Sequence, residues 1–374
     1  MLKVSVCIAV CAGFQVRPLR LAAPRARALG ERAAAPRAPA AAPAAGPSLQ
    51  NPIVADLPAY AAAVSVQAIP VLFDDKAAHY VFFLSLATLT VYLSARAPTL
   101  VPPETKPLTL EAALLAPVFA SASLGALYAC ITVLHVDPSQ VYRVLTSAFA
   151  TVAAAVLFDD TLDAVHVWRG GDEADEADAA DASAPAPAAA ALAVAVAAAY
   201  LAGVGNGVAV SNFLAWSLAL LAVRTVPLKS FRVGATLLAG LFFYDIFFVF
   251  GSDIMVTVAR TIDAPVKLVA PNAPGALNAQ AILGLGDVAI PALLVGFLAR
   301  YGAMRGDAIW LRNGVAAYAV GLSAAFYANE FIRSGQPALL YLVPAIVGSG
   351  VATALFVDGS PAPLFEYQED ETPR

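Results

Sequence analysis

Long apolar segments recur along most of this chain, and charged or proline-containing stretches separate many of them. A helix needs about 20 consecutive apolar residues to cross a bilayer. From residue 79 onward the pattern supplies nine segments of roughly this length. We therefore predict an all-α polytopic membrane fold with nine transmembrane helices, at 79–97, 111–134, 140–158, 187–204, 207–223, 231–250, 281–300, 312–331 and 337–357. The fourth segment is Ala-rich and the least apolar.

Three segments lie outside or between the predicted spans. Residues 53–78 are apolar but contain two prolines, so we predict an interfacial segment rather than a tenth span. Residues 159–185 form an acidic loop, and residues 358–374 form an acidic C-terminal tail. Runs of like charge are usually solvated and disordered, so we assign no chemistry to them. The predicted nine-helix domain accordingly covers 79–357.

Residues 1–52 differ in composition from the rest of the chain. An apolar run, Val4–Ala12, follows Lys3, and the next stretch is rich in Arg, Ala and Pro with Glu31 as its single acid. A short apolar core is typical of a signal peptide, and an Arg-rich, acid-poor stretch is typical of a transit peptide. Together they resemble the bipartite presequences of algae with complex plastids, which are removed. The alternative is a disordered Ala/Pro-rich tail.

The basic residues orient the predicted spans. The stretch 224–232, which joins the fifth and sixth spans, contains Arg224, Lys229 and Arg232, and the loop at 300–312 contains three arginines. Loops on the other side carry few basic residues. Because cytosolic loops carry an excess of Lys and Arg, we predict that 224–232 and 300–312 face the cytosol and that the N-terminus is luminal.

The composition excludes several classes of function. Hydrophobic residues make up 60% of the chain and charged residues 13%, against roughly 25% charged in soluble domains. The net charge of −5 gives no reason to expect a nucleic-acid partner. The three histidines are scattered and two of the three cysteines lie in the leader, so no disulfide framework or metal site is indicated. We expect neither a metal nor an organic cofactor.

Two aspartates lie within otherwise apolar spans. Asp245 is in the sixth span and Asp287 in the seventh. An ionisable side chain at membrane depth costs at least about 2.5 kcal/mol and usually marks a functional site. Each lies 13 residues from a basic residue on the predicted cytosolic side, Arg232 or Arg300. A helix rises 1.5 Å per residue, so both carboxylates should lie about 20 Å from those anchors and can face each other.

The residues around Asp287 predict an irregular backbone. Gly284 and Gly286 allow close backbone approach. Pro291 lies four residues after Asp287, so the Asp287 carbonyl loses its helical donor and the helix should kink. Irregular backbone is tolerated at membrane depth where it is buried in protein or lines a water-filled cavity.

A third element begins at Gln336 and continues through Pro337, Ala338 and Leu339. Pro337 is expected at or near the first helical position, where proline is favoured. Considered alone, this element is best explained as a helix start with packing residues.

Taken together, Tyr244-Asp245, Gly284-Leu285-Gly286-Asp287 and Pro337-Ala338-Leu339 resemble the three signatures of the GxGD intramembrane aspartyl proteases. They occur in the order of that family and on the sixth, seventh and ninth predicted spans. The intervening sequence is more similar to signal peptide peptidases than to presenilins, because only 30 residues separate the sixth and seventh spans, at 251–280. The resemblance extends over about residues 78–367 and is densest from 234 to 356.

The resemblance implies an aspartyl endopeptidase that cuts transmembrane helices, with Asp245 and Asp287 as the catalytic pair. It also implies that Tyr244, the Gly284–Gly286 run and the segment from Gln336 to Leu339 contact the substrate. Signal-peptide remnants and type II membrane segments are the implied substrates, membrane lipid is the surroundings, and homo-oligomers are left open. The implied location is the endoplasmic reticulum or another endomembrane, and the leader adds a plastid membrane as an alternative. The chain lacks the basic C-terminal retrieval signal common in animal members.

Two other functions are compatible with intramembrane aspartates. In a proton- or cation-coupled transporter or channel the pair would line an ion path, but no inverted repeat with matching broken helices is evident. A catalytically idle family member would bind membrane helices without cutting them, and the intact aspartate pair argues against it.

Overall fold

The structure, a computed structural model, describes residues 52–73, 75–97, 107–169, 185–204, 207–226, 228–262, 264–271, 280–332 and 335–369. The predicted leader lies outside these residues, apart from Pro52. The first half of the described chain is helical, with α2 Pro52–Val66, α3 Ile69–Leu72, α4 Lys76–Arg96, α5 Leu110–Thr132, α6 Ser139–Trp168, α8 Pro187–Ala202 and α9 Gly207–Thr225. The second half contains α10 Phe231–Phe250, α11 Ile254–Thr261, β1 Lys267–Pro271, β2 Gln280–Gly284, α12 Gly286–Met304, α13 Ile309–Ile332, α14 Leu339–Asp358 and α15 Ala362–Glu366.

Nine helices in the described part of the chain are long and apolar enough to cross a membrane. This finding confirms the all-α polytopic fold, although two members of the set differ from the prediction. Ile53–Leu72, which joins α2 and α3, qualifies as a span. The helix α8, Pro187–Ala202, is apolar but has only 16 residues, fewer than each of the nine long helices. Its length is about 24 Å at 1.5 Å per residue, which is less than the roughly 30 Å of the hydrocarbon core.

The segment predicted to be interfacial packs lengthwise against α4 instead. Near the start of α2, Asp56 accepts hydrogen bonds from Tyr92 Oη at 3.0 Å and from Arg96 Nε at 2.5 Å, at the far end of α4. The helix α3, which ends just before α4 begins, contacts α4 as well. A helix antiparallel to a span over its whole length crosses the same thickness. The prolines do not prevent this, because Pro58 lies inside α2 and Pro70 is at the start of α3. The described chain therefore begins on the side of Arg96, and the predicted luminal N-terminus, which lies outside the described residues, stays a prediction.

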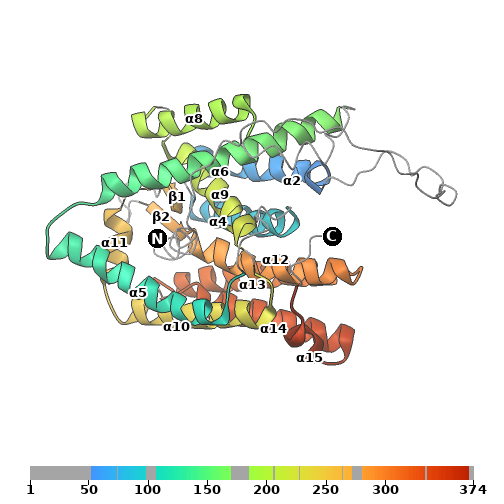
Figure 1. Cartoon of the computed structure of the whole chain (residues 1–374). Helices are drawn as coiled ribbons and strands as arrows, with labels where there is room; N and C mark the ends of the chain where they lie inside the picture. Colours follow the sequence, from blue (N-terminus) through green and yellow to red (C-terminus); the bar gives the residue numbers. More distant parts are fainter. Residues whose placement is uncertain are drawn as a thin grey trace, which may run out of the picture.

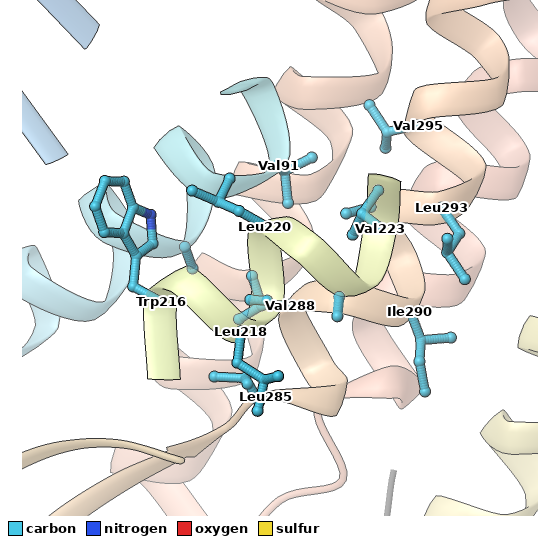
Figure 2. Packing of buried hydrophobic residues seen from close by; sticks show 14 of the residues in the cluster. Val91, Trp216, Leu218, Leu220, Val223, Leu285, Val288, Ile290, Leu293 and Val295 are labelled. Carbon is cyan, nitrogen blue, oxygen red and sulfur yellow. The ribbon is translucent and has the colours of Figure 1, made fainter. Parts of the chain in front are cut away.

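The helix α12 lies at the centre of the molecule. In Figure 1 it runs between a layer that contains α4, α6, α8 and α9 and a layer that contains α5, α10 and α14. It contacts α4, α9, α10, α13 and α14, and 72% of its most apolar stretch is buried, more than in any other candidate span of the described chain. Its start is packed by α9, where Leu218 lies beside Leu285 and Val288 (Figure 2). The rest of the molecule thus surrounds the helix that carries Asp287.

Two predicted boundaries are wrong for identifiable reasons. The span predicted at 281–300 begins with a strand: β2 pairs antiparallel with β1, with Lys267 opposite Gly284, and α12 starts only at Gly286. An apolar run cannot distinguish a buried strand from a helix by periodicity. The acidic loop predicted at 159–185 starts too early, because α6 continues to Trp168. In that added part Asp160 forms an ion pair with the buried Arg224 of α9.

The basic ends of α10 and α12 are joined by contacts that include the C-terminal tail. Arg300 Nη2, in α12, donates to the carbonyl of Leu228 at 2.7 Å, so the two basic loops lie on the same side, as predicted. The tail begins with α15, which packs on α14. It then bridges from Gln368 to Ser230, and Glu369 forms an ion pair with Arg300. The acidic tail therefore includes ordered structure that holds the starts and ends of neighbouring spans together.

Candidate active site

The helix α10 presents Asp245 on its inner face. The buried residues of its second half recur at the spacing of one helix face, and they are Leu241, Tyr244, Asp245 and Phe248. Phe243 and Phe247 on the opposite face are 68% and 63% exposed, as expected for residues that meet lipid. Asp245 itself is 1% exposed. The apolar pattern of α10 therefore determines that this carboxylate points into the protein.

Asp287 is placed by a β-hairpin that leads directly into α12. The strand β2 ends at Gly284, and Leu285 N then donates to Val266 O at 3.2 Å, which continues the pairing beside β1. Leu285 O next accepts from Ala289 N at 2.8 Å and begins the helix. Asp287 consequently lies in the first turn of α12, where the positive end of the helix dipole favours a negative charge. The sequence predicted irregular backbone here, and the structure shows a strand-to-helix junction.

The two aspartates are brought together around Tyr244. The helix α10 contacts both α12 and α14, and the carboxylates of Asp245 and Asp287 both act electrostatically on the Tyr244 hydroxyl. That hydroxyl is buried and has no hydrogen-bond partner among the described residues. Tyr244 lies beside Asp245 on the buried face of α10, and its expected contact with substrate stays a prediction.

Both aspartates keep the helical spacing from their anchors that the sequence predicted. The stretches from Arg232 to Asp245 and from Asp287 to Arg300 are continuous helix within α10 and α12. Each therefore rises about 20 Å along its helix. Because α10 and α12 pack together, and their basic ends are joined through Leu228, the carboxylates lie at comparable depth.

The start of α14 is bonded to Asp245. Leu339 N donates to Asp245 Oδ2 at 3.0 Å, and Leu339 is the first residue of α14. The first four N–H groups of a helix lack helical partners, so this bond satisfies one of them and sets the positive end of α14 against the carboxylate. Pro337 lies two residues before the helix, not at its first position, and Ala338 is the N-cap. Gln336 Oε1 accepts from Tyr341 Oη at 3.3 Å.

Two residues beside the site were missed by the sequence analysis. Tyr318 Oη, on α13, donates to the carbonyl oxygen of Asp287 at 3.2 Å. Asn212, on α9, is fully buried and bonds both backbone groups of Val269: its Nδ2 donates to the carbonyl and its Oδ1 accepts from the N–H, each at 2.8 Å. Pro291 signalled that the Asp287 carbonyl needs a new donor, but the sequence did not indicate which residue supplies it.

The hairpin is also fixed to the preceding helix. Lys267 Nζ donates to the carbonyls of Ala259 at 3.2 Å and Ile262 at 3.1 Å, at the end of α11. A Lys at a helix C-terminus bonds the carbonyls that have no helical donors. Within the described residues, no group of three or more His, Cys, Asp or Glu is arranged to hold a metal ion. The local chemistry is that of two carboxylates, a buried phenol and a helix N-terminus.

Comparison with known proteins gives this arrangement a context. A sequence model described as signal peptide peptidase matches residues 102–371. The chain is 38% identical over 174 residues to a protein of Schizosaccharomyces pombe named as a probable intramembrane protease, covering 43% of this chain and 58% of that protein. It is 39% and 38% identical over 165 residues to the signal peptide peptidases of Mus musculus and Homo sapiens, covering 42% of this chain and 43% and 44% of theirs. The chain thus spans about half the length of these relatives.

Proposed function

Because the match over residues 102–371 shows that the chain belongs to the signal peptide peptidase family, we propose that it is an aspartyl endopeptidase that cleaves transmembrane helices inside the bilayer. The observation that carries the proposal is that Asp245 and Asp287 lie at comparable depth on two packed helices, Asp245 on the buried face of α10 and Asp287 in the first turn of α12. The chain is an integral membrane protein by its apolar helices and by its family.

The two carboxylates share one proton in the resting enzyme. Two close carboxylates cannot both ionise cheaply, and the single negative charge that remains lies near the N-termini of α12 and α14. Both helix ends favour that charge. The bond from Leu339 N additionally holds one oxygen of Asp245 in place. This environment supports a singly ionised pair in surroundings of low polarity.

Hydrolysis then follows by acid–base catalysis. The ionised aspartate takes a proton from water as the water oxygen bonds to the scissile carbonyl carbon, while the protonated aspartate gives its proton to the carbonyl oxygen. The product is a neutral gem-diol. Its collapse breaks the C–N bond, with one proton passing from a diol hydroxyl to the pair and another from the pair to the amine.

The hairpin offers a place for an unwound substrate. Asn212 occupies the outer backbone groups of β1 at Val269, whereas β2 has β1 as its single strand neighbour in the described part of the chain. An extended peptide can add to such an edge by main-chain hydrogen bonds. A segment bound along Gln280–Gly284 would lead directly to Asp287. Gly284, Leu285 and Gly286, together with Gln336, Pro337, Ala338 and Leu339, would border the scissile bond.

The nature of the substrate follows from the site's position. Within a membrane, every backbone group must be bonded within its own helix or barrel, so a substrate helix must open locally before it can pair with β2. Signal-peptide remnants and type II membrane segments, the substrates implied by the family resemblance, fit this requirement. The endoplasmic reticulum or a related endomembrane is the proposed location, with a plastid membrane as the alternative raised by the leader.

The experiment that tests this function uses purified protein reconstituted into lipid vesicles. A transmembrane peptide should be cleaved by the wild-type protein and left intact by Asp287→Asn. Asp253→Asn is the matched control, because Asp253 is exposed, lies beyond the end of α10 and caps no helix through its side chain. Proton flux is measured in the same vesicles. Flux that depends on Asp287, without any cleavage, would replace the protease with an ion pathway.

A further inference from the structure

The carbonyl of Asp287 occupies a position at which the helix cannot supply its normal partner. In an α-helix the carbonyl of residue i accepts from the N–H of residue i+4. For Asp287 that residue is Pro291, which lies within α12 and has no N–H. A buried carbonyl without a donor is costly, so this group must be satisfied from outside the helix.

Tyr318 supplies that donor. Its hydroxyl donates to the Asp287 carbonyl oxygen at 3.2 Å, and Tyr318 is 0% exposed. The helices α12 and α13 are in contact. They approach closely at Gly314, where a Cβ would lie 3.2 Å from a side-chain atom of Val295. The phenol therefore cannot swing to water. The bond joins α13 to the backbone of the residue that carries one of the two acids.

We propose that Tyr318 is a positioning residue, which replaces the hydrogen bond withheld by Pro291 and thereby sets the orientation of the Asp287 side chain. This inference rests on the proposed function for its effect on catalysis, but the hydrogen bond itself does not. If the phenolic O–H is removed, the peptide unit after Asp287 rotates to find another donor, and the carboxylate moves with it. A displacement of about 1 Å can lower a catalytic rate on the order of 100-fold.

The test is a double-mutant cycle that combines Tyr318→Phe with Pro291→Ala. Ala at 291 provides the missing N–H, so the phenol should no longer be needed. With Pro291 present, Tyr318→Phe should lower kcat roughly 10- to 100-fold with little change in KM. In the Pro291→Ala background the same change should lower kcat less than about threefold. Tyr327→Phe is the matched control, because Tyr327 lies on α13 but is 65% exposed.

Melting temperature is measured on the same four proteins. Tyr318→Phe should lower it by about 3 °C when residue 291 is Pro and by less than about 1 °C when it is Ala. Equal losses in both backgrounds, or no loss in either, would overturn the proposal. If Tyr318→Phe fails to fold alone, recovery of a folded protein on adding Pro291→Ala supports the proposal, and failure of both overturns it. If the wild type cleaves no membrane peptide, the proposed function fails, and the melting temperatures alone decide.

Discussion

The two acids of the site are held in place by different means. Asp245 lies within the regular helix α10, on a face that apolar neighbours bury, and receives one bond from Leu339 N. Asp287 lies at a strand-to-helix junction, and its backbone depends on Val266, Tyr318 and the β-hairpin. Asp245 is therefore positioned mainly by its own helix, and Asp287 mainly by contacts with other parts of the chain.

This contrast suggests that substitutions at positions distant in sequence from both aspartates change the site mainly by displacing Asp287. The elements around it are α9, α13, β1 and β2. A residue that needs support from several elements is easier to disturb, and it is also easier to move when a substrate strand binds. Asp287, the acid next to the strand that would bind the substrate, would thus be the one that depends more on contacts with other elements.

The largest expected effect comes from the acids themselves. Asp245→Asn and Asp287→Asn keep the side-chain size but can neither accept nor release the proton. Each should lower kcat for a reconstituted membrane peptide on the order of 1,000-fold or more, since each acid supplies an indispensable part of acid–base catalysis. Despite their different supports, the two variants should be equally inactive. A variant that keeps even a tenth of the wild-type kcat would show that its aspartate is not one of the pair.

The next largest effect is expected at Asn212, which bonds both backbone groups of Val269 in β1. Asn212→Leu removes both bonds to Val269 and leaves two buried backbone groups unsatisfied, each costing about 1–3 kcal/mol. The hairpin should loosen, and kcat/KM should fall roughly 10- to 100-fold, because the strand that leads to Asp287 is no longer fixed.

Ser217→Ala is the control for Asn212→Leu. Ser217 is also buried on α9, but its hydroxyl bonds Phe213 O within the same helix. This variant should keep kcat/KM within about twofold. If Asn212→Leu cleaves as well as Ser217→Ala, the hairpin does not position Asp287.

The sequence predicts those features of the site that are set within one helix, and it misses those that are set by contacts with distant parts of the chain. The acids, their equal helical rise from Arg232 and Arg300 and the general fold could be predicted, because they depend on apolar length and on regular geometry within one helix. The strand at 280–284 could not, because a short apolar run is compatible with strand or helix until its partner is known. Tyr318 and Asn212 could not, because their partners lie 31 and 57 residues away.

The errors elsewhere have a similar origin. The interfacial interpretation of 53–78 relied on two prolines, but Asp56 accepts hydrogen bonds from Arg96 and Tyr92 across a helix pair. Proline content is a local signal, and packing against α4 is a tertiary one. In the same way, the helix α6 extends beyond its predicted end because Asp160 finds Arg224.

A moderate effect is expected when the substrate is made easier to unwind. A Gly in a helix interior costs about 1 kcal/mol relative to Ala, and a single Gly near the cleaved bond should raise kcat/KM about fivefold. The comparison uses two peptides that differ only by Ala→Gly, cleaved by the same vesicle preparation. Equal rates would contradict the requirement that the substrate open before it pairs with β2.

The smallest effect is expected far from the acids, at the ion pair of the tail. Arg300 and Glu369 are both about one-third exposed, and their side chains are 3.2 Å apart. Exposed ion pairs contribute about 0–1 kcal/mol, and Arg300 keeps its bond to Leu228 O. Glu369→Gln should therefore change kcat less than about twofold. A tenfold loss would show that the tail controls the catalytic helices and does more than join their ends.

The central claim, that Asp245 and Asp287 act as one unit, is tested most directly by the binding of a peptide isostere. The isostere carries a hydroxyl in place of the scissile carbonyl and thus mimics the gem-diol, and such analogues bind at least about 100-fold more tightly than substrates. Its Kd is measured for the wild type, Asp245→Asn, Asp287→Asn and the double variant. We expect each single variant to bind roughly 100-fold more weakly and the double variant no more weakly than either. Losses that multiply in the double variant, or a single variant that binds like the wild type, would contradict the account.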